Sequence, residues 1–354
     1  MQVYTMDIHD PQIDAAFMAR AMELASLGHG QVSPNPLVGC VIVHDGRIIG
    51  EGWHQRHGEP HAEVNAINSV ADKDLLREST LYVTLEPCTH YGKTPPCADL
   101  ILDQGIRRVV IANLDSNPNV SGMGASKLRA AGVEVASDVL QAACRHINRR
   151  FFTFVEQKRP YIILKWAETS DRFMGGGPSK WISNEISRQL VHRWRAEEDG
   201  VLVGRRTAEE DNPRLNVRDW TGRDPVRIVI DRYLRLNPSL HIFDQSQYTI
   251  CYNILREEQK ENLIRVKVNE ADFLAEMMED LYRRNIQSVI VEGGALILGL
   301  FIGAGLWDEA RVFRSKQHTG MGIAAPSLAA NLVGEETVSG DALLLYYPAD
   351  HRQY

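Results

Sequence analysis

Four side chains in the first hundred residues could build a metal site with an acid–base group beside it. His61 lies in G-E-P-H-A-E, and Glu63 follows it two positions later. Cys88 and Cys97 each follow a proline, in L-E-P-C and T-P-P-C. One imidazole and two thiolates are ligands that zinc prefers, and three protein ligands leave a fourth position open for water. The Glu63 carboxylate is then available to move protons.

A hydrolytic deaminase needs this set, because zinc activates a water and a carboxylate that is not a ligand carries the protons. The competing interpretation is a zinc clip that only stabilises the fold, which normally has a fourth protein ligand, here His90 or His57. The H-A-E and Pro-Cys patterns favour the deaminase, and we interpret His57 as structural. The remaining cysteines are expected to be small buried hydrophobic residues: Cys40, Cys144 and Cys251.

The elements that must position these residues are predicted to form an α/β layer. Asp10-Pro11 starts a helix that ends near Gly28. The runs VGCVIV and RIIGEGW, joined by Asp45-Gly46, predict a β-hairpin. A helix from His61 to about Val70 places His61 and Glu63 at its start. Strands and helices then alternate as far as VEVA, and a second alternating series begins at YIILKWAE.

Length and composition indicate the number of domains and exclude some classes of protein. A chain of 354 residues with 44% hydrophobic residues suggests two domains. The net charge of −7 argues against a nucleic-acid-binding face. Five cysteines suit a reducing cytoplasm, and the N-terminus lacks the pattern of a signal peptide. The apolar run 294–307 is too short to cross a bilayer and predicts a buried helix.

Several segments of the first half carry a family resemblance. SPNPLVGCVIV, GWHQRHGEPHAEVNAI, LEPCTHYGKTPPCADLI and LDSNPNVSGMG closely resemble the pyrimidine deaminase half of the bifunctional deaminase–reductase of riboflavin biosynthesis. The resemblance implies a cytidine-deaminase-like three-layer fold, one Zn²⁺ and a long inter-cysteine loop that binds substrate. The implied substrate contacts are Asn35, His54, Ala62, His90, Lys93, Thr94, Asp115 and Asn117. Asn35 and Asn117 also precede proline, so simple turn chemistry could explain both as well.

The second half resembles the reductase of the same enzyme. The segments are RPYIILKWAETSD, PSKWISN, RAEEDGVLVGRRTAEEDNPRLNVR and VIVEGG. The resemblance implies a dihydrofolate-reductase-like fold that uses NADPH. The implied substrate contacts are Lys165, Ser179, Arg195, Leu215, Arg218 and Glu292. The implied cofactor contacts are Ala167, Trp181, Thr207, Asp211, Arg232, Gly293 and Gly294.

Together the two resemblances imply a cytoplasmic bifunctional enzyme with a deaminase domain over residues 1–147, a linker helix over 148–158 and a reductase domain over 159–354. The first domain would deaminate 2,5-diamino-6-ribosylamino-4(3H)-pyrimidinone 5′-phosphate. The second would reduce the ribosyl chain to give 5-amino-6-(5-phosphoribitylamino)uracil. The implied partners are small phosphorylated pyrimidine ribosides, without nucleic acid or membrane, and the implied assembly is a homodimer or homotetramer.

Three features of the reductase half depart from the family pattern. Thr169-Ser170-Asp171-Arg172 stands where S-L-D-G is common, and Glu168 is expected to add negative charge near the nicotinamide. Arg232 would favour NADPH over NADH. The T-S-D-R departure alone supports the alternative of a deaminase whose second domain only binds ligand. A nucleic-acid-editing deaminase is disfavoured by the acidic charge, and a non-catalytic zinc-stabilised binding protein is disfavoured by Glu63.

Overall fold

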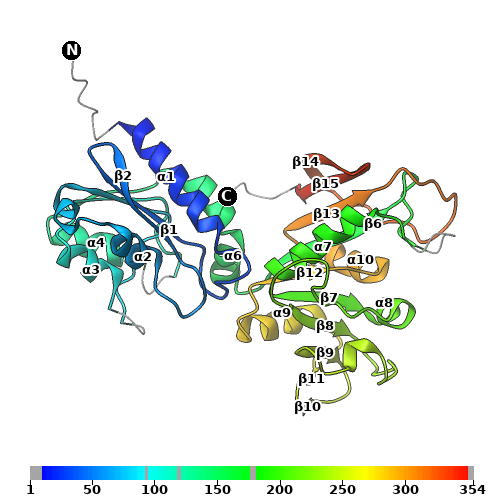
Figure 1. The fold of residues 1–354 in the computed structure, drawn as a ribbon. Helices are drawn as coiled ribbons and strands as arrows, with labels where there is room; N and C mark the ends of the chain where they lie inside the picture. The colour runs from blue at the N-terminus through cyan, green and yellow to red at the C-terminus, as the bar shows by residue number, and fades with distance from the viewer. Residues whose placement is uncertain (1–9, 92–94, 118–120, 176–180, 350–354) are drawn as a thin grey trace. The chain divides into compact units, whose positions relative to one another are not determined.

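The computed structural model describes residues 10–91, 95–117, 121–175 and 181–349. The chain folds as two compact units, the first extending to Gln157 and the second beginning at Lys158. Each unit has its own β-sheet (Figure 1), and buried apolar residues pack on both faces of each sheet. None of the helices in the described ranges has the length and hydropathy needed to span a membrane.

The first unit is built on a five-stranded sheet in the order β2-β1-β3-β4-β5. Its strands are β1 (Gly39–His44), β2 (Arg47–Trp53), β3 (Thr80–Val83), β4 (Arg108–Ile111) and β5 (Glu134–Ala136). β1 runs antiparallel to β2 and β3, and β3, β4 and β5 are parallel. The predicted hairpin turn is confirmed, since Asp45 and Gly46 both have the positive φ (47° and 70°) of a type I′ turn.

Helices cover both faces of this sheet and make the expected three layers. On one face lie α1 (Pro11–Ser26) and α5 (Gln141–Ile147), which pack on Val41 and Tyr82. On the other lie α2 (Ala62–Ser69), α3 (Cys97–Asp103) and α4 (Met123–Ala130), which pack on Cys40 and Ile42. Alternate strand residues therefore point to opposite layers. A 3₁₀ turn, η1 (Lys73–Glu78), precedes β3, and α6 (Arg149–Gln157) ends the unit.

The second unit is built on a ten-stranded sheet in the order β10-β11-β9-β8-β7-β12-β6-β13-β15-β14. Strands β6 (Tyr161–Glu168), β7 (Gly200–Gly204), β8 (Val226–Ile230), β9 (Thr249–Asn253), β11 (Leu263–Lys267), β12 (Ser288–Val291) and β13 (Glu309–Arg314) are parallel. Strands β10 (Glu258–Lys260), β14 (Ala330–Val338) and β15 (Asp341–Pro348) pair antiparallel at the two edges.

Helices cover this sheet too, and its central strands are buried on both sides, as their uninterrupted apolar sequences require. One core contains α7 (Glu185–Glu197) and α8 (Arg205–Asp211), and the other contains α9 (Phe273–Arg283) and α10 (Ala295–Gly303). A 3₁₀ turn, η2 (His241–Phe243), follows β8. The apolar helix α10 is buried on one side only, because Leu298 and Phe301 are fully buried whereas Leu296 is 77% exposed.

Candidate active sites

The three predicted zinc ligands of the first unit come together. The Nδ1 atom of His61 lies 3.6 Å from the Cys88 sulfur and 3.4 Å from the Cys97 sulfur. Their ligand atoms all lie within 4.8 Å of one another. His61 is the N-cap residue of α2, and Cys97 is the first residue of α3. The positive ends of two helices therefore meet at the cluster and favour its thiolates.

The neighbouring charges make this cluster suitable for a divalent cation. A hydrogen bond from Cys97 to the Cys88 thiolate lowers the pKa of Cys88 to about 4. Donating this hydrogen bond raises the pKa of Cys97, and the repulsion between two adjacent thiolates raises it further. A cation held between the sulfurs removes this repulsion and deprotonates both thiols. One imidazole and two thiolates fit zinc with one coordination position open.

Glu63 lies in the first turn of α2, beside the cluster, and is only 3% exposed. Burial and then the negative charge of Cys88 raise the pKa of Glu63 to about 7. A bound cation would favour the ionised form. A carboxyl group with a pKa near the working pH can both accept and donate a proton, which is what the predicted role requires.

Two predicted substrate residues of the first unit form a fixed pair. The His54 ring donates from Nδ1 to the Pro60 carbonyl at 3.1 Å, so its Nε2 accepts from the Asn35 side-chain amide at 3.0 Å. Burial lowers the pKa of His54, which keeps this ring neutral. The His54 and His61 rings meet edge to face at 5.6 Å. Asn35 and His54 therefore lie beside the metal cluster.

The other predicted residues of this site differ in their surroundings. Ala62 is the buried first residue of α2, and His90 is exposed. The Asp115 carboxylate accepts from the Asn117 backbone at 2.8 Å, and burial raises the pKa of Asp115. Lys93 and Thr94 lie outside the described residues.

The second unit contains a cavity of about 550 Å³ at the carboxyl ends of its central parallel strands, where α/β sheets bind ligands. Nine predicted residues line it: Lys165, Ala167, Trp181, Arg195, Thr207, Asp211, Leu215, Arg218 and Glu292. The four other predicted residues are not among the lining residues. Ser179 lies outside the described part of the chain, Gly293 and Gly294 follow Glu292, and Arg232 stacks 4.8 Å above the Phe273 ring.

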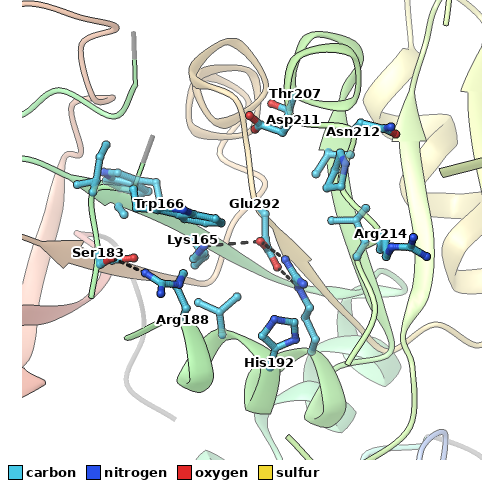
Figure 2. Close-up of a pocket in the computed structure, with 18 of the residues that line it drawn as sticks. Lys165, Trp166, Ser183, Arg188, His192, Thr207, Asp211, Asn212, Arg214 and Glu292 are labelled. Carbon is cyan, nitrogen blue, oxygen red and sulfur yellow. Dashed lines mark hydrogen bonds and ion pairs between the residues drawn. The ribbon is translucent and has the colours of Figure 1, made fainter. Parts of the chain in front are cut away.

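A buried charge cluster forms the floor of this cavity (Figure 2). The Arg195 guanidinium contacts both Glu292 oxygens, at 2.6 and 2.8 Å, and the Lys165 ammonium lies 3.6 Å from Glu292. Burial alone would raise the pKa of Glu292, but Arg195 and Lys165 lower it to about 2. Burial lowers the pKa of Lys165. The cluster therefore holds one carboxylate between two cations.

Cationic and polar lining residues surround the cluster. Figure 2 shows Arg188 and His192 approaching from α7, the helix that also carries Arg195. Their spacing in the sequence, i, i+4 and i+7, places all three on one helix face, a pattern that could have predicted Arg188 and His192. Arg214 and His241 also line the cavity and had no recognisable pattern. Such a lining suits phosphorylated ligands.

The departures in the T-S-D-R turn are accommodated by the fold. Arg172 has a φ of 66°, the conformation that glycine would favour there. Glu168 is fully buried and does not itself line the cavity, although Trp166 and Ala167 do, and its expected charge near the nicotinamide stays a prediction. Its carboxylate accepts from Trp166 Nε1 at 2.9 Å and from Arg314 Nε at 2.8 Å. Its negative charge is neutralised within the sheet.

Comparison with known families agrees with both halves. The family model of the cytidine and deoxycytidylate deaminase zinc-binding region matches residues 11–113, and that of the RibD C-terminal domain matches residues 160–320. The riboflavin biosynthesis protein RibD of Aquifex aeolicus is 40% identical, covering 92% of this chain and 93% of that protein. The Escherichia coli RibD protein is 38% identical, covering 85% of this chain and 87% of that protein.

Solved structures are similar over both units. The crystal structure of a diaminohydroxyphosphoribosylaminopyrimidine deaminase/5-amino-6-(5-phosphoribosylamino)uracil reductase from Thermotoga maritima is 37% identical, with a TM-score of 0.88, covering 96% of this chain and 100% of that chain. Acinetobacter baumannii RibD is 32% identical, with a TM-score of 0.88 and the same coverage. The chain belongs to the RibD family, the bifunctional riboflavin-biosynthesis enzymes that join a zinc-binding deaminase domain to a reductase domain.

Proposed function

We propose that the first unit deaminates 2,5-diamino-6-ribosylamino-4(3H)-pyrimidinone 5′-phosphate and that the second reduces the ribosyl chain with NADPH, giving 5-amino-6-(5-phosphoribitylamino)uracil. The observation that carries this proposal is the pairing, in one chain, of a His61–Cys88–Cys97 cluster beside buried Glu63 with a separate cationic cavity. The name of the Thermotoga maritima structure supports the choice of substrates.

In the deaminase site, His61, Cys88 and Cys97 hold the Zn²⁺. The ion supplies Lewis acidity that makes a water nucleophilic at neutral pH. The Glu63 carboxylate accepts a proton from the attacking water and then delivers protons to the ring nitrogen and the departing ammonia. The substrate contacts in this proposal are Asn35, His54, Ala62, His90, Lys93, Thr94, Asp115 and Asn117.

In the reductase site, the Glu292 carboxylate accepts hydrogen bonds from the ribosyl hydroxyls. Its charge cluster with Lys165 and Arg195 supports this role, because a carboxylate whose pKa is about 2 stays an acceptor at neutral pH. Leu215 and Arg218 are further proposed substrate contacts. Ser179, the last one, lies outside the described residues. NADPH supplies the hydride.

The dinucleotide contacts in this proposal are Ala167, Trp181, Thr207, Asp211, Arg232, Gly293 and Gly294. Gly294 is the N-cap of α10, and a side chain there would lie 3.2 Å from the Thr207 hydroxyl. The absence of a Cβ leaves room for a cofactor phosphate at the helix start. The preference for NADPH is supported by Arg232, a cation at the end of β8. The neighbouring Asp231 carboxylate accepts hydrogen bonds from the backbone N–H groups of Arg235 and Leu236.

The domain limits, assembly and location are part of the same proposal. We assign residues 1–147 to the deaminase, 148–158 to a connecting helix and 159–354 to the reductase. The division of the chain between Gln157 and Lys158 supports the second limit. A homodimer or homotetramer in the cytoplasm is proposed, and light scattering and cell fractionation would test these two points.

The direct test gives the zinc-loaded protein the diaminopyrimidine ribosyl phosphate and follows ammonia release and NADPH absorbance separately. Both signals are expected. Ammonia without NADPH oxidation would mean that the second unit only binds ligand. Oxidation of NADH at the same rate as NADPH would contradict the cofactor preference. Neither signal, with zinc confirmed by atomic absorption, would mean that the proposed substrate is wrong.

A further inference from the structure

A second buried carboxylate lies next to the zinc cluster and has no role in the chemistry described above. Glu86 stands two residues before Cys88, between β3 and α3, and is 7% exposed. Its Oε2 accepts from the backbone N–H groups of Asp115 at 3.1 Å and Gly122 at 2.8 Å. Its Oε1 accepts from the Ala125 backbone N–H at 2.9 Å. The side chain therefore joins three separate points of a distant segment.

Two of these bonds cap a helix that cannot cap itself. Gly122 is the N-cap residue of α4, and Ala125 lies in the first turn of that helix. A glycine has no side chain to accept the free N–H groups at a helix start, and α4 has no side-chain cap bond from its N-cap residue. A negative charge is also favoured at this end of a helix. Glu86 therefore caps α4 from another segment of the chain.

The backbones are in direct contact at the same point. A Cβ on Gly124 would lie 2.1 Å from the Pro87 carbonyl and 3.1 Å from the Glu86 side chain. The Glu86 N–H also donates to the Asn113 carbonyl at 2.9 Å. The start of α4 and the residues before Asp115 thus lie directly on the Glu86-Pro87 dipeptide that leads to Cys88.

We propose that Glu86 is a positioning residue for the deamination. It holds Asp115 and the start of α4 at a fixed distance from Cys88, so that the pyrimidine bound by Asp115 and Asn117 meets the metal cluster. Glu86 does not touch the substrate in this proposal. The role rests on the proposed deaminase function and adds a residue to it.

The test is Glu86→Gln in the zinc-loaded full-length protein. A glutamine has one acceptor oxygen and one NH₂ group, so it leaves at least one of the three N–H groups facing a donor. The KM for deamination is expected to rise about tenfold or more, the usual effect of losing a bond to a buried charged group. The kcat should stay within about threefold and the bound zinc at one per chain, since the cluster and Glu63 are untouched. Reduction of the deaminated intermediate by the second unit should not change.

Hydrogen exchange provides a second readout that needs no substrate. Peptides containing Asp115 or Ala125 are expected to exchange about tenfold faster in Glu86→Gln than in the native chain. The matched control is Glu134→Gln, which removes a charged partner of buried Arg108 at the opposite end of β4 from Asn113. This control should leave both the KM and the exchange of those peptides unchanged. Glu86→Asp keeps the charge on a shorter arm and should give an intermediate KM.

The outcomes separate the two proposals. If the native chain releases no ammonia, the proposed substrate is wrong. Hydrogen exchange then tests Glu86 by itself, and unchanged exchange of the Asp115 and Ala125 peptides in Glu86→Gln would overturn its role. If the native chain is active, an unchanged KM overturns the positioning role even when exchange is faster, because Glu86 is then only a helix cap. Loss of zinc from Glu86→Gln would overturn it as well, since the carboxylate would then support the metal cluster.

Discussion

Two buried glutamates show how the same side chain acquires opposite properties. Burial and a nearby thiolate raise the pKa of Glu63 to about 7. Two cations lower that of Glu292 to about 2, although Glu292 is also buried. The first environment suits a group that exchanges protons, and the second suits a group that stays ionised and accepts hydrogen bonds.

Glu63→Gln is expected to reduce the kcat of deamination by about 10²–10⁴-fold, because the amide cannot carry a proton. The zinc content should stay at one per chain, since Glu63 is not a ligand, and the reductase rate should be unchanged. Ammonia release and atomic absorption measure the two effects. An active Glu63→Gln protein would contradict the proton-transfer role.

Glu292→Gln is expected to abolish reduction and to destabilise the second unit by roughly 3 kcal/mol at neutral pH, because Arg195 and Lys165 lose their buried partner. The folded pKa of about 2 lies below the usual value for glutamate, so this stabilisation is present above about pH 4.3 and is lost as the pH falls towards 2. The difference in unfolding free energy between the native chain and Glu292→Gln should therefore shrink over that range.

Tryptophan fluorescence can follow this transition, because five of the six tryptophans lie after Lys158. Ammonia release by the first unit is the control and should be unaffected by Glu292→Gln. A stability difference that stays constant from pH 7 to pH 2 would show that Glu292 is not held ionised by its two cations.

At the scale of elements, the position of α2 depends on a close approach to β2. A Cβ on Gly52 would lie 2.3 Å from the Ala66 nitrogen and 2.6 Å from the Ala62 oxygen. The helix carries His61 and Glu63 at its start, so its distance from the sheet sets where both side chains lie.

Gly52→Ala is expected to push α2 outwards, to destabilise the first unit by about 1–3 kcal/mol and to weaken zinc binding by about 10–100-fold. Competition with a chelating dye measures the zinc affinity. Gly299→Ala in α10 is the matched control, because nothing lies within 4 Å of an added Cβ there. Equal zinc affinity in Gly52→Ala and the native chain would show that the zinc site does not depend on the close approach of α2 to β2.

In the turn that follows β6, Asp171 and Arg172 have different structural roles. Asp171 accepts from the Thr169 hydroxyl at 2.6 Å and from the Gly320 N–H at 2.7 Å, which ties the turn to the segment before β14. Gln317 of that segment donates to the Trp181 carbonyl at 3.1 Å, at the cavity lining. Asp171, rather than Arg172, is therefore the structural residue of the turn.

Arg172→Gly should change the free energy of unfolding by less than about 1 kcal/mol, since glycine tolerates a positive φ. The half-exposed arginine side chain forms a long ion pair with Glu168 at 3.9 Å and an exposed hydrogen bond to the Pro326 carbonyl at 3.3 Å, and both are weak. The kcat/KM for reduction should stay within about threefold. Asp171→Ala should lower kcat/KM by about tenfold or more, because at least two hydrogen bonds to a charged group are lost. A large gain in reductase activity in Arg172→Gly would show instead that the departure impairs this chain.

The elements with regular patterns were predictable, and the edges of the second sheet were not. The β-hairpin with Asp45-Gly46 and the buried central strands have unambiguous turn or apolar patterns. Strands β10 and β14 are mostly exposed, so their sequences EQK and ANLVGEETV have no hydrophobic periodicity to predict them. The metal ligands were predictable because their chemistry restricts residue type. Arg214, His241 and Glu86 act through tertiary placement, which composition and spacing do not contain.

At the scale of the whole molecule, the two sites belong to separate compact units. Removing zinc with a chelator is therefore expected to abolish ammonia release and to leave NADPH-dependent reduction of the deaminated intermediate within about twofold of its original rate. Adding Zn²⁺ back should restore deamination. The two rates are measured on the same sample, and a parallel loss of both would show that the units do not function separately.

The place of β6 in its sheet has a consequence for how the chain is made. β6 follows directly after the first unit, yet it pairs with β12 and β13, and Ile162 bonds to Asp308, 146 positions later. At ordinary translation rates of about 5–20 residues per second, the ribosome needs roughly 7–30 s to supply these partners. The deaminase unit can fold during that time, while YIILKWAE stays an unpaired apolar strand. A nascent chain stalled between residues 200 and 280 should therefore already bind zinc and still require a chaperone.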